Sequence, residues 1–385
     1  MIARLLHPVL NDYVSQFPVI FLTGPRQSGK STLEKTLVGW SYVNLEDPDQ
    51  RNLATNEPAL FLAQLGEKAI IDEAQHVPEL FSHIQLIVDE NPQRKFLLTG
   101  SQNFLMLEKI TQSLAGRTGI LQLLPFSMDE LAYVGKLPAL ETYLWKGSYP
   151  RIYDQNIDPK AFYNGYLNTY VERDVRSIRN IGDLATFRRF LGLCAGRIGQ
   201  LLNMNALATE TGTSVNTIKH WLSVLEASYV IYLLQPYHKN FNKRITKSPK
   251  LYFYDTGLAC RLLLINKPEE LLNHFARVQI FESLVITEIR KSLLNAGEMP
   301  HLYFWRDSHG HEVDLLIDQG ATITAVEIKS GKNPSLNYLK GLKYWQELTS
   351  ESAETSKVVY AGEQQMRTGH GDLVPWMKVV DLVSK

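Results

Sequence analysis

The sequence has few cysteines and lacks a long apolar run. Only Cys194 and Cys260 occur in 385 residues, which excludes a disulfide scaffold and leads us to expect a reducing, cytoplasmic setting. Spanning a bilayer takes about 20 consecutive apolar residues, and none of the apolar runs approaches that length. The N-terminus also lacks the apolar core of a signal peptide. We therefore expect no membrane partner.

Net charge is absent as well. The 40 lysines and arginines balance 40 aspartates and glutamates, so the formal net charge is zero. No global field attracts nucleic acid or an anionic membrane, and any such binding must come from local patches. The hydrophobic fraction of 44% and the charged fraction of 21% are ordinary for a folded protein. At this length, two or three domains are expected.

One stretch organises the N-terminal part of the chain. Residues 24–31 read GPRQSGKS and follow the apolar run 19–23. They match the phosphate-binding pattern GxxxxGK[ST], with a predicted strand before and a helix after. Glycine lets successive backbone N–H groups surround a polyphosphate, and the helix dipole adds to the attraction. The expected nucleotide-binding residues are Gly24, Pro25, Arg26, Gln27, Ser28, Gly29, Lys30, Ser31 and Thr32, with Asp72 further on.

Two acids close the apolar run 68–71. In the chemistry of such sites, Lys30 would reach the terminal phosphates and Ser31 would donate its hydroxyl to Mg²⁺. Asp72 would hold the metal through its water shell, and Glu73 would polarise the attacking water. A phosphate-loop pattern alone could be a chance match, and two acids could simply mark the end of a strand. Together they predict an ATP-hydrolysing protein whose cofactors are ATP and Mg²⁺.

Two more polar positions border this predicted core. The run 95–101 is a predicted strand that ends in hydroxyl residues, where Ser101 or Thr99 would sense the terminal phosphate. The alternative is a simple strand-to-helix cap. Arg117 precedes another predicted strand, and it is either a solvated ion-pair partner or a charge-neutralising arginine finger.

Five ordered motifs carry a family resemblance. GPRQSGKSTL, IIDEAQ, LLTGSQ, AGRTG and LPFSMDEL occur in this order between residues 24 and 131. Together they resemble a family of prokaryotic AAA+-type ATPases whose uncharacterised C-terminal region is related to PD-(D/E)xK nucleases. The resemblance covers nearly the whole chain. It implies an α/β protein with a P-loop NTPase core of AAA+/ASCE type at 1–155 and a restriction-endonuclease-like α/β domain at 266–385.

The middle region, 156–265, is predicted to hold a winged helix. Residues 204–226 show a helix-turn-helix pattern with Ser214 as the N-cap of the second helix. Two apolar runs, 229–234 and 250–254, flank a basic loop that would grip phosphates. The predicted nucleic-acid contacts are Lys219, Lys239, Lys243, Arg244, Lys247 and Lys250. The alternative is a protein-docking module with a soluble loop.

A second chemical constellation lies near the C-terminus. On a predicted strand, Glu327 and Lys329 fall on one face because side chains alternate with a period of two. Asp314 on the neighbouring strand would meet them, and Glu282 would approach from a helix. The order resembles the PD-(D/E)xK core, with Val313 in place of the proline. Asp314 and Glu327 would bind Mg²⁺ or Mn²⁺, and Lys329 would position the water nucleophile.

These patterns leave two functions open. The first is an enzyme that couples ATP hydrolysis to DNA binding or to metal-dependent DNA cleavage, with Glu282, Asp314, Glu327 and Lys329 as its second catalytic set. The second is an ATP-switched module that binds protein or nucleic acid and retains a silent nuclease fold. A homo-oligomer or a protein partner is compatible with either function.

Overall fold

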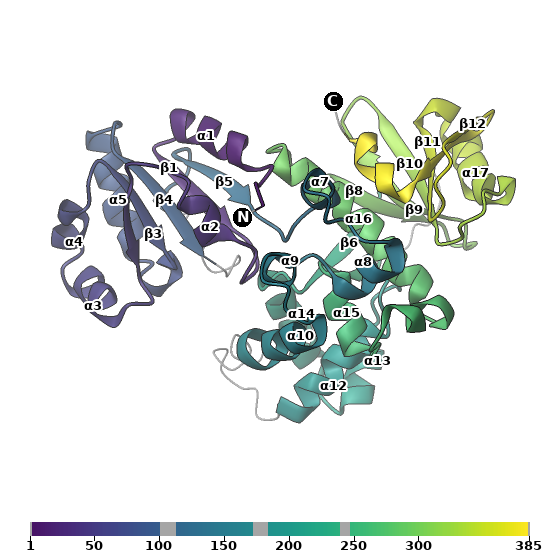
Figure 1. Ribbon diagram of the computed structural model, residues 1–385, viewed down its shortest axis with the longest axis horizontal. Helices are drawn as coiled ribbons and strands as arrows, with labels where there is room; N and C mark the ends of the chain where they lie inside the picture. The colour runs from purple at the N-terminus through teal and green to yellow at the C-terminus, as the bar shows by residue number, and fades with distance from the viewer. Residues whose placement is uncertain (1, 101–112, 172–183, 239–246, 384–385) are drawn as a thin grey trace.

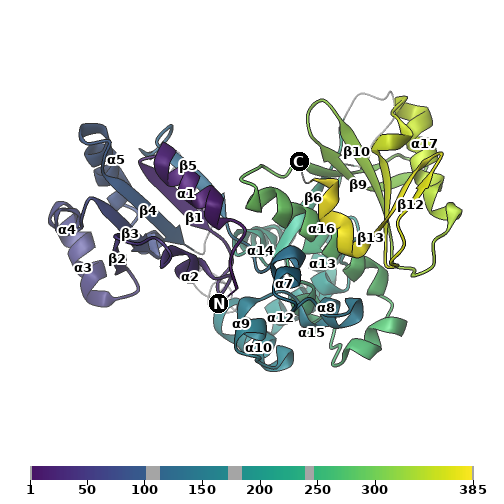
Figure 2. The same ribbon diagram turned by 45° about the horizontal axis from the view of Figure 1, so that its top comes forward.

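The computed structural model describes residues 2–100, 113–171, 184–238 and 247–383. Figures 1 and 2 show a first α/β lobe that stands to one side, a helical region, and a second sheet at the opposite end. The first lobe is built on five parallel strands in the order β2-β3-β4-β1-β5. Their bounds are β1 Val19–Thr23, β2 Ser41–Asn44, β3 Lys68–Asp72, β4 Lys95–Gly100 and β5 Thr118–Gln122.

The first sheet has helices on both faces. Alternation along β1 sends Ile20 and Leu22 into one core with the helices α1 and α2, while Val19 and Phe21 enter the other with α3 to α5. This burial on both faces explains why the strands read as continuous apolar runs. The helices are α1 His7–Gln16, α2 Lys30–Glu34, α3 Pro48–Asn56, α4 Pro58–Gln64, η1 Ala74–His76 and α5 Leu80–Glu90. The lobe is consistent with the predicted P-loop NTPase core, with β4 between the two motif strands.

The helices that follow β5 belong to a different core. A single buried cluster joins residues from 124 onward, through the helical region, to one face of the second sheet. These helices are α7 Met128–Tyr133, α8 Leu140–Lys146, α9 Pro150–Asp154, α10 Pro159–Tyr166, η2 Leu167–Val171, α12 Leu184–Ala195, α13 Met204–Thr211, α14 Val215–Ala227, α15 Thr256–Leu262, η3 Pro268–Asn273 and α16 Arg277–Asn295. Residues 124–154 therefore pack with the helical region rather than with the first sheet.

The second sheet is mixed and has eight strands in the order β12-β13-β11-β10-β9-β8-β6-β7. Their bounds are β6 Ile231–Pro236, β7 Lys250–Phe253, β8 Leu302–Arg306, β9 Glu312–Asp318, β10 Ile323–Lys329, β11 Ser356–Tyr360, β12 Met366–Thr368 and β13 Gly371–Pro375. The hairpin β6–β7 joins this sheet because β6 pairs with β8 in parallel. The sheet thus spans residue 265, where the sequence suggested a boundary between two domains.

Two helices cover the second sheet. The core under α16 contains Leu315 and Val326, whereas Leu316 and Ala325 face α17 on the other side. The remaining elements are η4 Leu336–Leu339, α17 Lys340–Thr349, η5 Ala353–Thr355 and η6 Trp376–Leu382. Among the helices that lie in the described ranges, not one is both long and apolar enough to span a bilayer.

Candidate functional sites

The phosphate loop turns where glycine is required. Gly24 has φ 152°, and a Cβ at this position would lie 2.1 Å from the carbonyl oxygen of Leu123. Gly29 has φ 100° and precedes the first residue of α2. Both conformations disfavour L side chains, so the glycines of the motif serve close backbone approach and left-handed geometry. The strand–loop–helix context predicted from the sequence is present.

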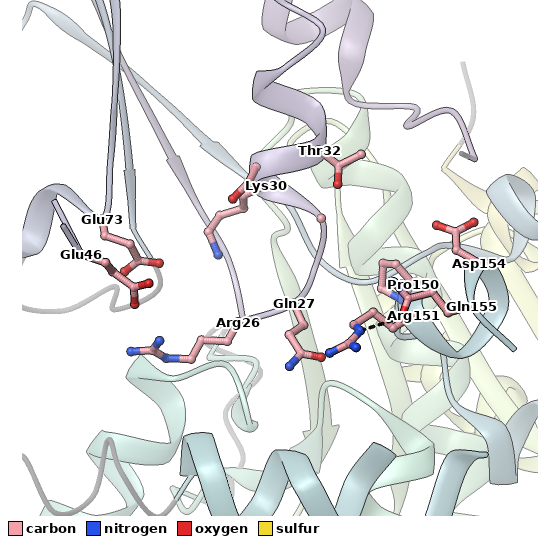
Figure 3. A pocket seen from close by; sticks show the side chains of 12 residues that line it. Arg26, Gln27, Lys30, Thr32, Glu46, Glu73, Pro150, Arg151, Asp154 and Gln155 are labelled. Atoms are coloured by element: carbon pink, nitrogen blue, oxygen red, sulfur yellow. Dashed lines mark hydrogen bonds between the residues drawn. The ribbon is translucent and has the colours of Figure 1, made fainter. Parts of the chain in front are cut away.

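The loop borders a cavity of about 550 Å³. Figure 3 shows Lys30 directed toward its centre, with Glu46 and Glu73 on one side and residues of α9 on the other. The lining residues are Arg26, Gln27, Gly29, Lys30, Ser31, Thr32, Glu46, Glu73, Pro150, Arg151, Asp154 and Gln155. The sequence analysis did not predict Glu46 or the residues of α9 in this cavity, because no local pattern indicates contacts between residues so far apart in the chain.

The predicted catalytic and metal-binding groups of this site meet at Asp72. Its carboxylate accepts hydrogen bonds from Ser31 Oγ at 3.3 Å, from Tyr42 Oη at 2.8 Å and from the buried Thr99 hydroxyl. Glu73 donates its backbone N–H to the same carboxylate at 3.0 Å. Ser31 and Asp72 therefore present two hard oxygen donors to one point, a donor set that fits Mg²⁺.

Lys30 is buried within the loop. Its Nζ donates to the carbonyl oxygens of Gly24 at 2.9 Å and Pro25 at 3.0 Å. Burial lowers its pKa, while the nearby Glu73 and Glu34 carboxylates act in the opposite direction. Glu34 is the buried last residue of α2, where burial and the nearby Asp72 charge raise its pKa to about 8. The loop is thus folded around its lysine, which faces both the cavity and the acids.

The structure places Thr99 in the nucleotide site and Arg117 away from it. Ser101 lies outside the described residues, but its alternative, Thr99, contacts Asp72 directly. Arg117 lies at the amino end of β5, whereas the phosphate loop follows the carboxyl end of the parallel strand β1. It forms an ion pair with Asp89, Nε to Oδ1 at 2.5 Å. Arg117 therefore lies away from the cavity of its own chain and pairs with Asp89, which is compatible with the ion-pair alternative.

Three of the six predicted nucleic-acid residues lie in the described part of the chain. Lys219 is exposed on α14, and Lys247 is exposed just before β7, while Lys239, Lys243 and Arg244 lie outside the described residues. Lys250 needs correction. It is only 3% exposed, and its Nζ pairs with Glu282 at 3.2 Å and with Glu312. A buried ammonium held by two carboxylates is not available to a phosphate, because it is removed from solvent and its charge is already paired.

The C-terminal acids converge on β9 and β10. These strands are antiparallel, and their paired register ends with Val326 opposite Leu315, which are the immediate neighbours of Glu327 and Asp314 in the sequence. Lys329 Nζ lies 2.6 Å from Glu327 Oε2 and 3.4 Å from Asp314 Oδ2. The backbone N–H of Ile328 also donates to Asp314 Oδ2 at 2.8 Å. The two acids and the lysine therefore share one face of the sheet, as the strand period predicted.

Glu282 approaches the same cluster from α16. Its carboxylate accepts from Lys250 Nζ and from Tyr252 Oη. Burial raises the pKa of Glu282 to about 7, and burial together with the Asp314 charge raises the pKa of Glu327 to about 8. The charge of Asp314 contributes to the raised pKa of both Glu282 and Glu327, so the three carboxylates lie near one another, a set of acids that fits a hard divalent cation. Lys250 and Tyr252 are additions that sequence reasoning had not placed here.

Three family models match successive parts of the chain. A family model described as "AAA domain" matches residues 16–132, and two domains of unknown function, DUF8612 and DUF4143, match 137–269 and 278–379. "Uncharacterized protein Rv2008c" of Mycobacterium tuberculosis and "Uncharacterized protein Mb2031c" of Mycobacterium bovis are each 33% identical over 327 residues, which cover 83% of this chain and 72% of theirs. The first region is thus an AAA-type ATPase domain.

A solved structure offers a looser likeness. The Walker-type ATPase PABY2304 of Pyrococcus abyssi is 17% identical, with a TM-score of 0.44 over 67% of this chain and 94% of that one.

Proposed function

We propose that ATP hydrolysis in the first lobe is coupled to metal-dependent cleavage of DNA at the C-terminal acidic cluster, which consists of Glu282, Asp314 and Glu327. The chain belongs to the family of the mycobacterial proteins Rv2008c and Mb2031c. The observation that carries the proposal is the position of Lys329, whose Nζ reaches the carboxylates of both Asp314 and Glu327. The AAA-type domain supports ATP binding and hydrolysis in general, and the DNA-directed step is the specific part of the proposal.

The nucleotide site has a group for each part of the first reaction. Lys30 and the loop N–H groups bind the phosphates, and Ser31 with Asp72 would hold Mg²⁺, which neutralises charge on the phosphoryl group. Glu73 lines the cavity from the end of β3, where its carboxylate can orient a water and accept its proton. The Thr99 hydroxyl donates a hydrogen bond to the Asp72 carboxylate and so holds it in place.

The C-terminal cluster has the donors for phosphodiester hydrolysis. Asp314 and Glu327 would hold a Mg²⁺ or Mn²⁺ ion, which would supply Lewis acidity and a more acidic bound water. Lys329 is positioned to hold the nucleophilic water and to stabilise negative charge on the phosphate. The side chain of Lys329 is 33% exposed, so the cluster opens toward solvent on the lysine side.

DNA is the substrate class that the helical region favours. The helices α13 and α14 meet at Gly212, which has φ 70°, and Ser214 caps α14 through the backbone N–H of Thr217. Lys219 is exposed on α14, the helix that would enter a groove if this pair is a winged helix. The hairpin that follows is part of the same sheet as the acidic cluster, so DNA bound here would lie on the same body as the cleavage site.

A second function is favoured by the ion pairs themselves. Lys329 pairs with two of the carboxylates, and Lys250 pairs with Glu282 and Glu312. The raised pKa values of Glu282 and Glu327 allow protons to neutralise the remaining negative charge. A cluster balanced in this way does not need a metal, which supports an ATP-switched binding protein with a silent nuclease fold. In that case the nucleotide would control binding of protein or nucleic acid, and no phosphodiester bond would be broken.

One assay separates these functions. The purified chain is incubated with ATP, Mg²⁺ or Mn²⁺, and supercoiled, linear, single-stranded or branched DNA, and the products are resolved by electrophoresis. Cleavage that is lost in Glu327→Ala but kept in Glu347→Ala, an exposed glutamate on α17, supports the nuclease. Absence of cleavage on every DNA form, with ATP-dependent DNA or protein binding retained, supports the silent fold.

A further inference from the structure

The N-terminal segment before α1 reaches the back of the phosphate loop. Arg4 is 8% exposed, and its guanidinium donates three hydrogen bonds. Nη1 donates to the carbonyl oxygen of Ser28 at 2.7 Å, Nη2 to the carbonyl oxygen of Leu124 at 2.6 Å, and Nε to Glu130 Oε1 at 3.0 Å. One side chain thus joins the loop to the segment that follows β5 and to the helix α7.

The geometry of a phosphate loop explains why this contact matters. When successive N–H groups turn inward to meet phosphates, the carbonyl oxygens of the same peptides turn away from them. The Ser28 carbonyl is one of these, and a buried carbonyl without a donor is costly. A guanidinium is a planar fork with fixed donor directions, so it can hold two carbonyls and a carboxylate at once. An ammonium cannot reproduce that arrangement.

The acid that holds Arg4 is itself anchored. Glu130 is buried, and its carboxylate also accepts from the backbone N–H of Leu5 at 2.8 Å and of Ser127 at 2.9 Å. The guanidinium lies 5.1 Å from the ring centroid of Phe126, which completes its enclosure. Arg4 therefore has little freedom to move, and neither does the peptide of Ser28 that it holds.

We propose that Arg4 is a positioning residue of the nucleotide site, which fixes the phosphate loop with its N–H groups directed inward before nucleotide binds. This inference rests on the proposed binding of ATP at the loop. A loop fixed in advance loses less conformational freedom on binding, and that saving appears as affinity. The positive charge also lies directly behind the loop, since a Cβ on Gly29 would be 3.3 Å from Arg4 Nη1. Both effects act on the phosphates and not on the base.

The dependence on phosphate number distinguishes positioning from simple support of the fold. Arg4→Lys keeps the charge but loses the fork, so it should weaken Mg²⁺–ADP binding about tenfold, the loss of one charge-assisted hydrogen bond. AMP, whose single phosphate does not fill the loop, should change less than twofold. Arg189→Lys, an exposed arginine on α12, is the matched control and should bind both nucleotides like the wild type.

The experiment is calorimetric titration of wild type, Arg4→Lys and Arg189→Lys with Mg²⁺–ADP and with AMP, with thermal unfolding of each nucleotide-free protein. An ADP-specific loss in Arg4→Lys supports the proposal. Equal losses for ADP and AMP, or unchanged ADP affinity, overturn it. If the wild type binds neither nucleotide, the proposed ATP binding is wrong, and the inference about Arg4 is overturned with it. This result differs from a failure of the Arg4 inference alone, in which the wild type still binds Mg²⁺–ADP.

A second variant covers the case in which Arg4→Lys does not fold. Glu130→Gln keeps the shape of the carboxylate but removes the charge that holds the guanidinium. It should give the same ADP-specific loss, about threefold, because one acceptor of the network is weakened rather than lost. If both variants fail to fold, Arg4 is needed for the fold itself and the proposal is overturned.

Discussion

The backbone N–H of Met128 donates to Glu288 Oε2 at 2.7 Å, across 160 positions of the sequence. Lys291, one turn further along α16, donates to the carbonyl oxygen of Phe126 at 2.8 Å and to Ser148 Oγ at 3.1 Å. The same helix carries Glu282 into the acidic cluster, six residues and so about 9 Å from Glu288. A single helix thus touches both the segments that flank the nucleotide cavity and the C-terminal acids.

ATP binding and ATP turnover should be separable. Lys30→Ala removes a charged contact with the phosphates and should weaken ATP binding by roughly 10- to 100-fold. Glu73→Gln keeps the shape of the side chain but removes the base, so it should bind ATP normally while kcat falls by about 10²–10⁴. Equilibrium binding and phosphate release measure the two effects. Lys35→Ala, an exposed lysine after α2, is the control, and wild-type affinity in Lys30→Ala would contradict the site.

Metal binding at the C-terminal cluster should strengthen as the pH rises. Burial raises the pKa of Glu327 from 4.5 to about 8, so the metal-free protein holds a proton that must leave before the carboxylate binds a cation. Mn²⁺ affinity, measured without nucleotide, should increase about tenfold per pH unit for each proton released, up to roughly pH 8. Glu327→Gln should remove the part of this dependence that comes from Glu327, whereas Glu347→Gln should keep all of it. Affinity that is flat between pH 6 and 8 would contradict the site.

The same raised pKa affects folding. Between pH 4.5 and about 8, the native carboxyl of Glu327 holds a proton that the unfolded chain has lost. The native state therefore binds more protons, and the free energy of unfolding of the metal-free protein should fall as the pH rises through this window. Chemical denaturation of wild type and Glu327→Gln measures the difference, and the variant should show the shallower decline.

Gly341 should control the position of Glu327. A Cβ at this residue of α17 would lie 2.1 Å from Glu327 Oε1, so Gly341→Ala must displace the carboxylate. Alanine favours the helix, and apart from Glu327 the Cβ would come close to the carbonyl oxygen of Glu312, at 3.0 Å. Mn²⁺ affinity at the cluster should fall by at least tenfold, while ATP turnover is unchanged. Gly369→Ala, where a Cβ meets nothing within 4 Å, is the matched control. Unaltered Mn²⁺ binding in Gly341→Ala would exclude Glu327 as a ligand.

Lys250 should be essential to stability rather than to DNA binding. Lys250→Met leaves Glu282 and Glu312 without their buried cation, and removing one partner of such a pair costs about 3–5 kcal/mol. Denaturant unfolding should show this loss. DNA affinity of the folded fraction should stay within about twofold of the wild type. A stable variant with much weaker DNA binding would restore Lys250 to the phosphate contacts.

DNA binding should depend on salt and on exposed lysines. Because phosphate contacts release counterions, affinity should fall steeply between roughly 50 and 200 mM salt. Lys219→Glu and Lys247→Glu should each weaken binding across all sequences and reduce the salt slope by about 1. Lys35→Glu on the first lobe is the control. If these changes leave DNA affinity intact while a protein partner is lost, the helical region is a docking module.

The sequence by itself determined the parts that depend on local geometry. The glycines at 24 and 29, the acids at 72 and 73 and the paired helices that meet at Gly212 follow from spacing, because backbone conformation and helix caps are set within a few residues. The shared face of Asp314, Glu327 and Lys329 followed from the strand period and from a short connection that makes the two strands neighbours.

Only the tertiary structure decided what meets across long separations. Arg4 behind the phosphate loop, the α9 wall of the cavity and the burial of Lys250 leave no local pattern, because each depends on contacts between residues more than 20 positions apart. The position of Arg117 depended on strand order, which an arginine before an apolar run does not reveal. The hairpin β6–β7 joined the second sheet for the same reason, since β8, its partner, is supplied by a distant part of the chain and satisfies the backbone groups of β6.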